Sequence, residues 1–180
     1  MTAIVAISEN GKVYMGGDSA GSNSQKIVNR KDEKVFVKGK FIFGCTSSFR
    51  MIQILKWSFV IPPHKKGMSD EEYMNTIFIN AIRKCFKKYG FGRVSEGSDN
   101  RGGVFLVGYK GTIYEVESDF QVGMCHDNFN AVGCGDDTCI GSLFSTKHEP
   151  ARTRLQRALE AAEFRNVGVR APYVIKCLEK

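Results

Sequence analysis

The sequence contains no run of about 18 apolar residues, the length that a membrane-spanning helix requires. Its start also lacks the positively charged stretch followed by an apolar segment that marks a secretory signal. From these two absences we expect a cytoplasmic protein without a membrane partner.

No two cysteines form a Cys-x-x-Cys pair, although the chain has six cysteines. Scattered cysteines are typical of reduced, mostly buried thiols and not of a disulfide framework. One stretch holds several possible zinc ligands whose spacing matches no common zinc site, namely Cys125, His126, Cys134 and Cys139. We therefore expect no bound metal.

Acidic residues are fewer than basic ones, and the formal net charge is +7. Nucleic-acid-binding proteins often carry such a charge, but the sequence has neither a zinc finger nor an aromatic RNA-binding motif. Lysines spaced around helices are more often a solvated face, so we expect no specific nucleic-acid partner. Internal repeats and linkers are also lacking, and 42% hydrophobic content is enough for one core. The sequence therefore predicts a single domain over residues 1–180.

The chain does have a threonine directly after its first methionine. Removal of Met1 would leave Thr2 with both a hydroxyl and a free α-amino group. Such an amine can activate the hydroxyl of its own residue. Its ordinary pKa of about 7.7–8.0 makes it a usable base near neutral pH. Many proteins have Thr at this position without a chemical role, so the residues that follow decide its meaning.

The residues after Thr2 predict a β-hairpin. Residues 2–7 are apolar and suit a buried strand, residues 9–11 have the composition of a tight turn, and residues 12–17 return as a second strand. Because a hairpin brings its two ends together, Asp18 should lie beside Thr2. A further short strand after Lys34 can place that lysine at the same end. Taken singly, Asp18 is more simply a turn residue and Lys34 a solvated charge.

A second feature is the junction at residues 46–48, between an apolar strand over residues 40–45 and an apolar helix that begins near Phe49 and ends before Pro62. These polar residues suit a helix N-cap, where unpaired backbone amides favour an anion. A tetrahedral intermediate of acyl transfer presents such an anion. A serine cap without any ligand explains the stretch equally well.

The rest of the chain alternates helices and strands. A capping box at residues 69–72 predicts a helix that runs to Gly90. A polar loop is expected over residues 92–103, followed by strands at 104–108, 112–116 and 129–133. Two helices follow, the second with Pro150 in its first turn, and a closing strand spans residues 173–178. The spacing alone indicates a mixed α+β domain.

The residues Thr2, Gly17-Asp18-Ser19 and Lys34-Val35 resemble the threonine, aspartate and lysine motifs of the proteasome β-subunit family, which includes the bacterial HslV-type peptidase. These are N-terminal-nucleophile (Ntn) hydrolases. The resemblance covers nearly the whole chain, and it implies a four-layer αββα sandwich of two mainly antiparallel sheets flanked by helices.

The same resemblance implies roles for single residues. Thr2 would be the nucleophile, supported by Asp18 and Lys34, and the backbone amide of Ser47 would stabilise the oxyanion. Cys134 stands in Gly133-Cys134-Gly135, where the family has Gly-Ser-Gly and the serine supports the threonine amine. A thiol is a weaker hydrogen-bond donor than a hydroxyl, so this network is expected to be looser. The alternative for Cys134 is a small buried residue between glycines.

Substrate-binding residues also follow from the resemblance. Gly21 and Ser22 match the segment that pairs with substrate backbone as an added strand. Ser47 and Ser48 replace the glycine usual at the strand-to-helix junction, which narrows the approach to the site. The supporting aspartate that the proteasome has near residues 166–169 finds no counterpart here.

The function that the resemblance implies is a threonine-type endopeptidase. It would act on polypeptides without a metal or organic cofactor, as a self-compartmentalised homo-oligomeric ring served by an ATP-dependent unfoldase. Activity would require removal of Met1, since a retained methionine blocks the amine. Two alternatives remain: a non-catalytic ring or assembly subunit with the same fold, and an Ntn amidase with a small-molecule substrate.

Overall fold

The computed structural model describes residues 1–22, 25–46, 48–91, 93–95, 98–100 and 103–179. Most strands lie in two antiparallel sheets. The first sheet has the order β12 (Phe129–Gly133), β1 (Ala3–Glu9), β2 (Lys12–Gly17) and β13 (Val174–Leu178). The second sheet has the order β11 (Val122–Met124), β10 (Thr112–Val116), β9 (Phe105–Tyr109), β6 (Phe41–Cys45) and β5 (Val35–Lys38). Two small hairpins pair β3 (Ala20–Ser22) with β4 (Ile27–Asn29) and β7 (Arg93–Ser95) with β8 (Ser98–Asn100).

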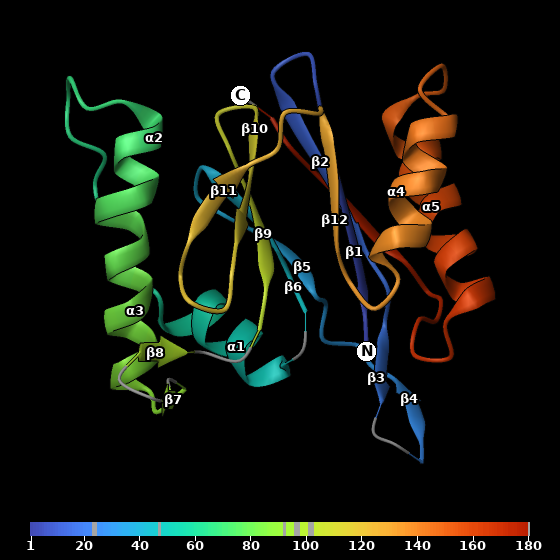
Figure 1. Cartoon of the computed structure of the whole chain (residues 1–180), viewed down its shortest axis with the longest axis horizontal. Coiled ribbons are helices and arrows are strands. Elements are labelled where there is room, and N and C mark those ends of the chain that lie inside the picture. The colour runs from blue at the N-terminus through green and yellow to red at the C-terminus, as the bar shows by residue number, and fades with distance from the viewer. Residues whose placement is uncertain (23–24, 47, 92, 96–97, 101–102, 180) are drawn as a thin grey trace.

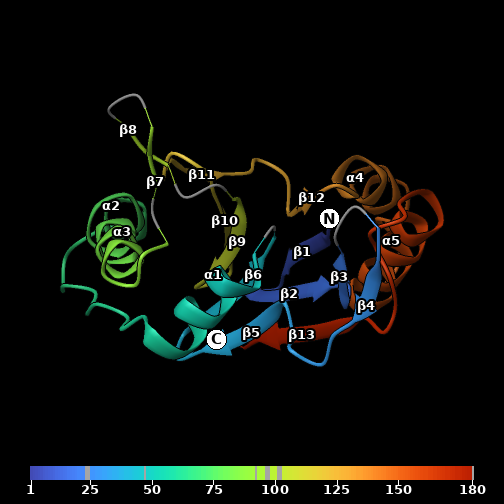
Figure 2. The ribbon, with the colours of Figure 1, turned by 90° about the horizontal axis from the view of Figure 1, so that it is seen from below.

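Helices cover both outer faces of the paired sheets. The second sheet is covered by α1 (Phe49–Gln53) with the π-helical turn η1 (Ile54–Ser58), and by α2 (Asp70–Tyr73), the π-helical turn η2 (Met74–Phe78) and α3 (Ile79–Lys88). The first sheet is covered by α4 (Asp136–Ser145) and α5 (Ala151–Arg165). Figure 1 shows the resulting layers from left to right, and Figure 2 shows the same order from below. The predicted four-layer αββα fold is confirmed.

The burial of β1 explains why its residues 3–7 are apolar without interruption. Alternate residues of a strand point to opposite faces of a sheet. Ala3, Val5 and Ile7 pack in the core beneath α4 and α5. Ile4 and Ala6 belong instead to the core between the two sheets. Both faces of β1 are therefore buried, which a run of apolar residues satisfies.

The two sheets come into close contact at Gly44 in β6. A Cβ atom on this residue would lie 2.4 Å from Ile4 Cγ2 and 2.6 Å from Met15 Sδ. Only glycine permits this approach without a shift of the neighbouring side chains. The contact holds the end of β6 close to the start of β1, where Thr2 lies.

Most of the predicted elements are present. The turn between β1 and β2 has positive φ angles at Asn10 and Gly11, as the turn sequence predicted. The Ser69 side chain caps α2 by accepting a hydrogen bond from Glu72 N at 3.1 Å. Pro150 occupies the N-cap of α5, one residue before the first turn in which it was expected.

Two hairpins were not predicted. The expectation of a loop over residues 92–103 is wrong in part, because β7 and β8 pair within it. Only Val94 among their six residues is apolar, so no apolar alternation marks them as strands. The hairpin of β3 and β4 was missed because each strand has only three residues, one of them a glycine in β3. Among the described residues, no helix combines the length and apolar character needed to cross a membrane.

Candidate active site

Three polar residues distant in sequence meet at one end of the first sheet. Thr2 directly precedes β1, Asp18 follows β2, and Lys34 precedes β5. The register of β1 and β2 pairs Ile4 with Gly17, and Asp18 N donates to the Ala3 carbonyl at 3.3 Å. The hairpin thus brings Asp18 beside Thr2, and the packing of the second sheet brings Lys34 to both.

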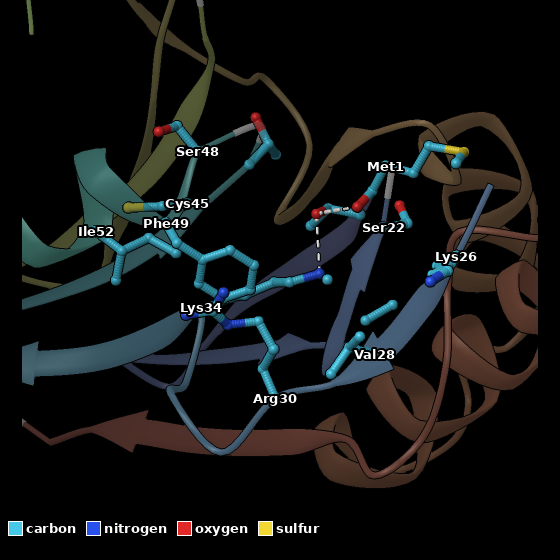
Figure 3. Close-up of a pocket in the computed structure, with 14 residues that line it drawn as sticks. Met1, Ser22, Lys26, Val28, Arg30, Lys34, Cys45, Ser48, Phe49 and Ile52 are labelled. Atoms are coloured by element: carbon cyan, nitrogen blue, oxygen red, sulfur yellow. Dashed lines mark hydrogen bonds between the residues drawn. The ribbon is translucent and has the colours of Figure 1, made fainter. Parts of the chain in front are cut away.

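The Lys34 ammonium is the centre of this cluster. Its Nζ lies 2.7 Å from Asp18 Oδ1 and 2.9 Å from Thr2 Oγ1 (Figure 3, in which a dashed line joins Lys34 to the hydroxyl). The exposed fractions are 4% for Thr2, 1% for Asp18 and 3% for Lys34. A charge-assisted contact in a place with so little water interacts strongly with its neighbours.

The Asp18 carboxylate is fixed by backbone donors from three segments. Oδ1 accepts from Ala3 N at 3.1 Å, and Oδ2 accepts from Ala20 N at 2.9 Å and from Arg170 N at 3.3 Å. These bonds orient the carboxylate toward Lys34. They also tie the segment that precedes β13 to the site.

Burial lowers the pKa of Lys34 below its ordinary value, while the negative charge of Asp18 and its hydrogen bond act in the opposite direction. The positive charge on Lys34 therefore depends on Asp18. That charge stabilises the ionised form of a hydroxyl placed next to it.

Met1 is present in this structure and determines the state of Thr2. The Thr2 nitrogen is a peptide amide, and the Thr2 hydroxyl donates a hydrogen bond to the Met1 carbonyl. An amide nitrogen does not act as a base. In this form the cluster holds an oriented hydroxyl and a nearby cation, without the general base that a free amine would supply.

Cys134 contacts the backbone of Thr2. Thr2 N donates to Cys134 Sγ at 3.3 Å, and the thiol lies 3.5 Å from the Thr2 carbonyl oxygen. The adjacent Gly133 has a φ of 112°, and a Cβ on it would lie 2.2 Å from that carbonyl. Glycine is required here so that the turn can approach Thr2 closely. Cys134 is exposed, so the alternative of a buried spacer does not fit.

The strand-to-helix junction is only partly described. Ser48 is the N-cap of α1, and its side chain accepts from Met51 N at 3.4 Å. Its own amide donates to the Thr46 carbonyl at 2.7 Å. Ser47, the expected oxyanion donor, lies outside the described residues.

A pocket of about 390 Å³ opens beside Thr2. Its lining includes Gly21, Ser22 and Ser48, which were predicted to bind substrate, as well as Lys34. Figure 3 shows Lys34, Arg30 and Phe49 grouped on one side of it. A second pocket of about 400 Å³ also touches Thr2, and its lining includes Cys134 and Asp136.

Some contributors to the site could not be found in the sequence. Arg170 acts through its backbone, with its amide on Asp18 and its carbonyl accepting from Ser19 N at 2.9 Å. No side-chain pattern signals such a contact. Arg30 and Phe49 line the first pocket, and neither belongs to a motif. Across the described ranges, no three His, Cys, Asp or Glu side chains are grouped so that they could hold a metal ion.

Comparison with known proteins supports the fold. The sequence matches no protein-family model, and a comparison with curated proteins finds no match. Among solved structures, Thiobacillus denitrificans BPH is similar with a TM-score of 0.82 at 16% identity, over 99% of this chain and 98% of that chain. The same protein in complex with Epoxomicin gives 0.81 at 16% identity, with coverage of 99% and 98%. Eukaryotic HslV from Trypanosoma brucei gives 0.70 at 13% identity, over 99% and 100% of the two chains.

At these identities the likeness concerns the fold. The chain has the proteasome- and HslV-type Ntn hydrolase fold over nearly its whole length, so the resemblance first suggested by Thr2, Asp18 and Lys34 is confirmed at that level.

Proposed function

We propose that residues 1–180, as one domain, form a threonine-type endopeptidase whose nucleophile is Thr2 after removal of Met1. One observation carries the proposal: a buried ammonium, Lys34 Nζ, contacts both Thr2 Oγ1 and Asp18 Oδ1. A structural ion pair would not need a hydroxyl of the second residue of the chain as its third member. The fold likeness adds support.

Removal of Met1 changes the site in two ways. It frees the Thr2 amine, and it removes the carbonyl to which the Thr2 hydroxyl donates in this structure. The hydroxyl proton then passes to the amine, directly or through one water, as Oγ1 attacks a peptide carbonyl. The amine gives the proton to the leaving nitrogen, and the peptide bond breaks to leave an acyl ester on Thr2. Water, deprotonated by the same amine, hydrolyses the ester.

The neighbouring residues assist this sequence. Lys34 places a positive charge 2.9 Å from Oγ1, which stabilises negative charge that develops there. Asp18 keeps Lys34 charged and positioned. Cys134 orients the nitrogen of Thr2 through its 3.3 Å contact. For the oxyanion we propose the Ser47 amide, because the Ser48 amide already has an acceptor in Thr46.

Polypeptide is the proposed substrate, bound in extended form along Gly21, Ser22 and Ser48 at the pocket. We further propose a homo-oligomeric ring that encloses the sites and receives chains from an ATP-dependent unfoldase. Exposed aromatic side chains on the helices, Trp57, Phe144 and Phe164, offer apolar contact surface. Light scattering on the purified protein tests assembly, and a monomer at all concentrations would refute the ring.

A non-catalytic subunit is the second candidate, and Met1 favours it. Besides accepting from the Thr2 hydroxyl, Met1 packs against Gly168, where a Cβ would lie 2.1 Å from Met1 Cβ. A protein that keeps these contacts in the cell has no general base.

The intact mass of protein from its natural host, combined with hydrolysis of fluorogenic peptide amides, separates these functions. We expect a mass without Met1, and hydrolysis that survives in Thr2→Ser and is lost in Thr2→Ala. A retained Met1, or equal rates for Thr2→Ala and the parent, would overturn the peptidase. Hydrolysis limited to small amides would favour the amidase.

A further inference from the structure

The two pockets that Thr2 lines differ in their other lining residues. Cys134, the contact of the Thr2 nitrogen, lines the second pocket but not the first. The nitrogen is the proposed proton donor to the leaving amine, so the leaving group departs toward the second pocket. That pocket also contains Asp136, a carboxylate that suits an emerging ammonium. The substrate residue before the cleaved bond, whose carbonyl forms the acyl ester, therefore places its side chain in the first pocket.

The first pocket is lined by cationic side chains. Lys26, Arg30 and Lys34 contribute to it, and its described lining includes no aspartate or glutamate. Lys34 is neutralised by Asp18 beneath it, at 2.7 Å. The charges of Arg30 and Lys26 lie nearer the entrance, on the exposed segment that includes β4.

Arg30 is held in place before any ligand arrives. Its stem crosses Gly21 so closely that a Cβ there would lie 2.6 Å from Arg30 Cδ. Its guanidinium lies 3.9 Å from the centroid of the Phe49 ring, and Figure 3 shows the two side chains together. Asp32 accepts from Arg30 Nε at 2.7 Å and from Nη2 at 2.6 Å. This ion pair offsets the charge of Arg30 as Asp18 offsets that of Lys34. It uses two of the five N–H donors of a guanidinium, and three remain for a ligand.

The inner wall of the pocket is apolar. Cys45 is fully buried, Ile52 is 4% exposed, and both line the pocket with the Phe49 ring. A side chain that enters there meets apolar surface along its stem and positive charge at its head. Glutamate has this combination, whereas leucine lacks the charge and lysine carries the wrong one.

We propose that the first pocket selects substrates with an acidic residue, glutamate in particular, on the acyl side of the cleaved bond, and that Arg30 is the specificity-determining residue. This inference rests on the proposed peptidase activity of Thr2. Arg30 would bind the carboxylate through its remaining N–H groups, with the added field of Lys26.

The test compares peptide amides that differ only in the residue before the cleaved bond, as Glu, Gln, Leu and Lys, with enzyme that lacks Met1. Glu and Gln have nearly the same shape, so their ratio reports charge alone. We expect kcat/KM for Glu to exceed that for Gln by roughly fivefold, typical of a partly exposed ion pair, and the ratio to fall with added salt. Equal or faster turnover of Gln would overturn the inference and leave the peptidase intact.

Arg30→Met should lower the Glu-to-Gln ratio toward one, since the ion pair with the substrate is lost and only the field of Lys26 remains. An unchanged ratio in the folded variant would overturn the role of Arg30. The matched control is Arg152→Met, the same loss of charge on the exposed face of α5 outside both pockets, which should keep the parent ratio. A thermal melt checks that each variant folds. If Arg30→Met does not fold, the salt dependence of the Glu-to-Gln ratio in the parent protein tests the inference instead. No hydrolysis of any of the four peptides, together with no labelling of Thr2 by an epoxyketone, would overturn the proposed function itself and the inference with it.

Discussion

The ion pair of Asp18 and Lys34 makes a quantitative prediction about stability and activity. The Lys34 and Asp18 side chains are 2% and 0% exposed, and Nζ and Oδ1 are 2.7 Å apart. Removing one member of such a pair leaves an uncompensated buried charge. Removing both leaves none. The single variants Asp18→Asn and Lys34→Met and the double variant therefore form an informative cycle.

The expected free energies follow from the contacts. Lys34→Met should lower the free energy of unfolding by about 3–5 kcal/mol, the cost of breaking a buried pair. Asp18→Asn should lower the free energy of unfolding by the same amount and by about 1–3 kcal/mol more. The additional loss arises because an amide NH₂ would then face backbone donors such as Ala20 N and Arg170 N. The double variant should retain only this second cost. Because each single variant includes the cost of breaking the pair, the coupling energy is about 6 kcal/mol or more.

Urea denaturation gives the free energy of unfolding of the parent, the two single variants and the double variant. Peptide hydrolysis is measured on the same samples after Met1 removal. Stability should recover in the double variant while hydrolysis stays lost, because neither charge remains beside Thr2. Additive losses of less than about 1 kcal/mol each would mean that both groups lie in water and do not form a buried pair.

Three further predictions concern the surroundings of the site. The alkaline limb of kcat/KM should fall with a midpoint below pH 10.5, because burial lowers the pKa of Lys34 and its charge is lost earlier as pH rises. Cys134→Ser should hydrolyse peptides at least as fast as the parent and Cys134→Ala about fivefold more slowly, since a hydroxyl bonds the amine better than a thiol. Glu163→Gln should lower the free energy of unfolding by about 1 kcal/mol near neutral pH, because Glu163 accepts from the Tyr173 hydroxyl and the Ala171 amide.

Each of these has a distinct contrary result. For the pH profile, a constant rate to pH 10.5 in protein shown to be folded would mean that Lys34 has its ordinary pKa. For Cys134, a tenfold loss in the serine variant would mean that the thiol has a role of its own. For Glu163, the hydrogen bond from Tyr173 lowers its folded pKa below the ordinary 4.5, so its contribution is present above that pH and lost as pH falls through the lowered value. A gap between parent and variant that does not shrink in acid would contradict this sign.

The parts of the structure that the sequence predicted are those set by local rules. The apolar run after Thr2 and the Asn10-Gly11 turn predicted the first hairpin, and the hairpin alone implies that Asp18 comes near Thr2. The Ser69 cap likewise depends on residues three positions apart. The prediction that Lys34 lies beside Thr2 and Asp18 required the family resemblance, because the position of Lys34 depends on how the two sheets pack.

Other features could not be predicted, for physical reasons. The Arg170 amide reaches Asp18 across 152 positions, and any residue except proline could supply that donor. The β3–β4 hairpin has too few residues to show a period. The cationic character of the first pocket appears only when Gly21, Arg30 and Phe49 are brought together, since the sequence separates the ring from the guanidinium.

The proposed mechanism requires that Thr2 become a nucleophile activated by its own amine. Its test is the intact mass and peptide map of Met1-free protein after incubation with an epoxyketone, a covalent probe for N-terminal threonines. We predict one adduct per chain, located on Thr2 and absent from Thr2→Ala. An unmodified chain, or an adduct on another residue such as Cys134, would mean that Thr2 is not an activated nucleophile.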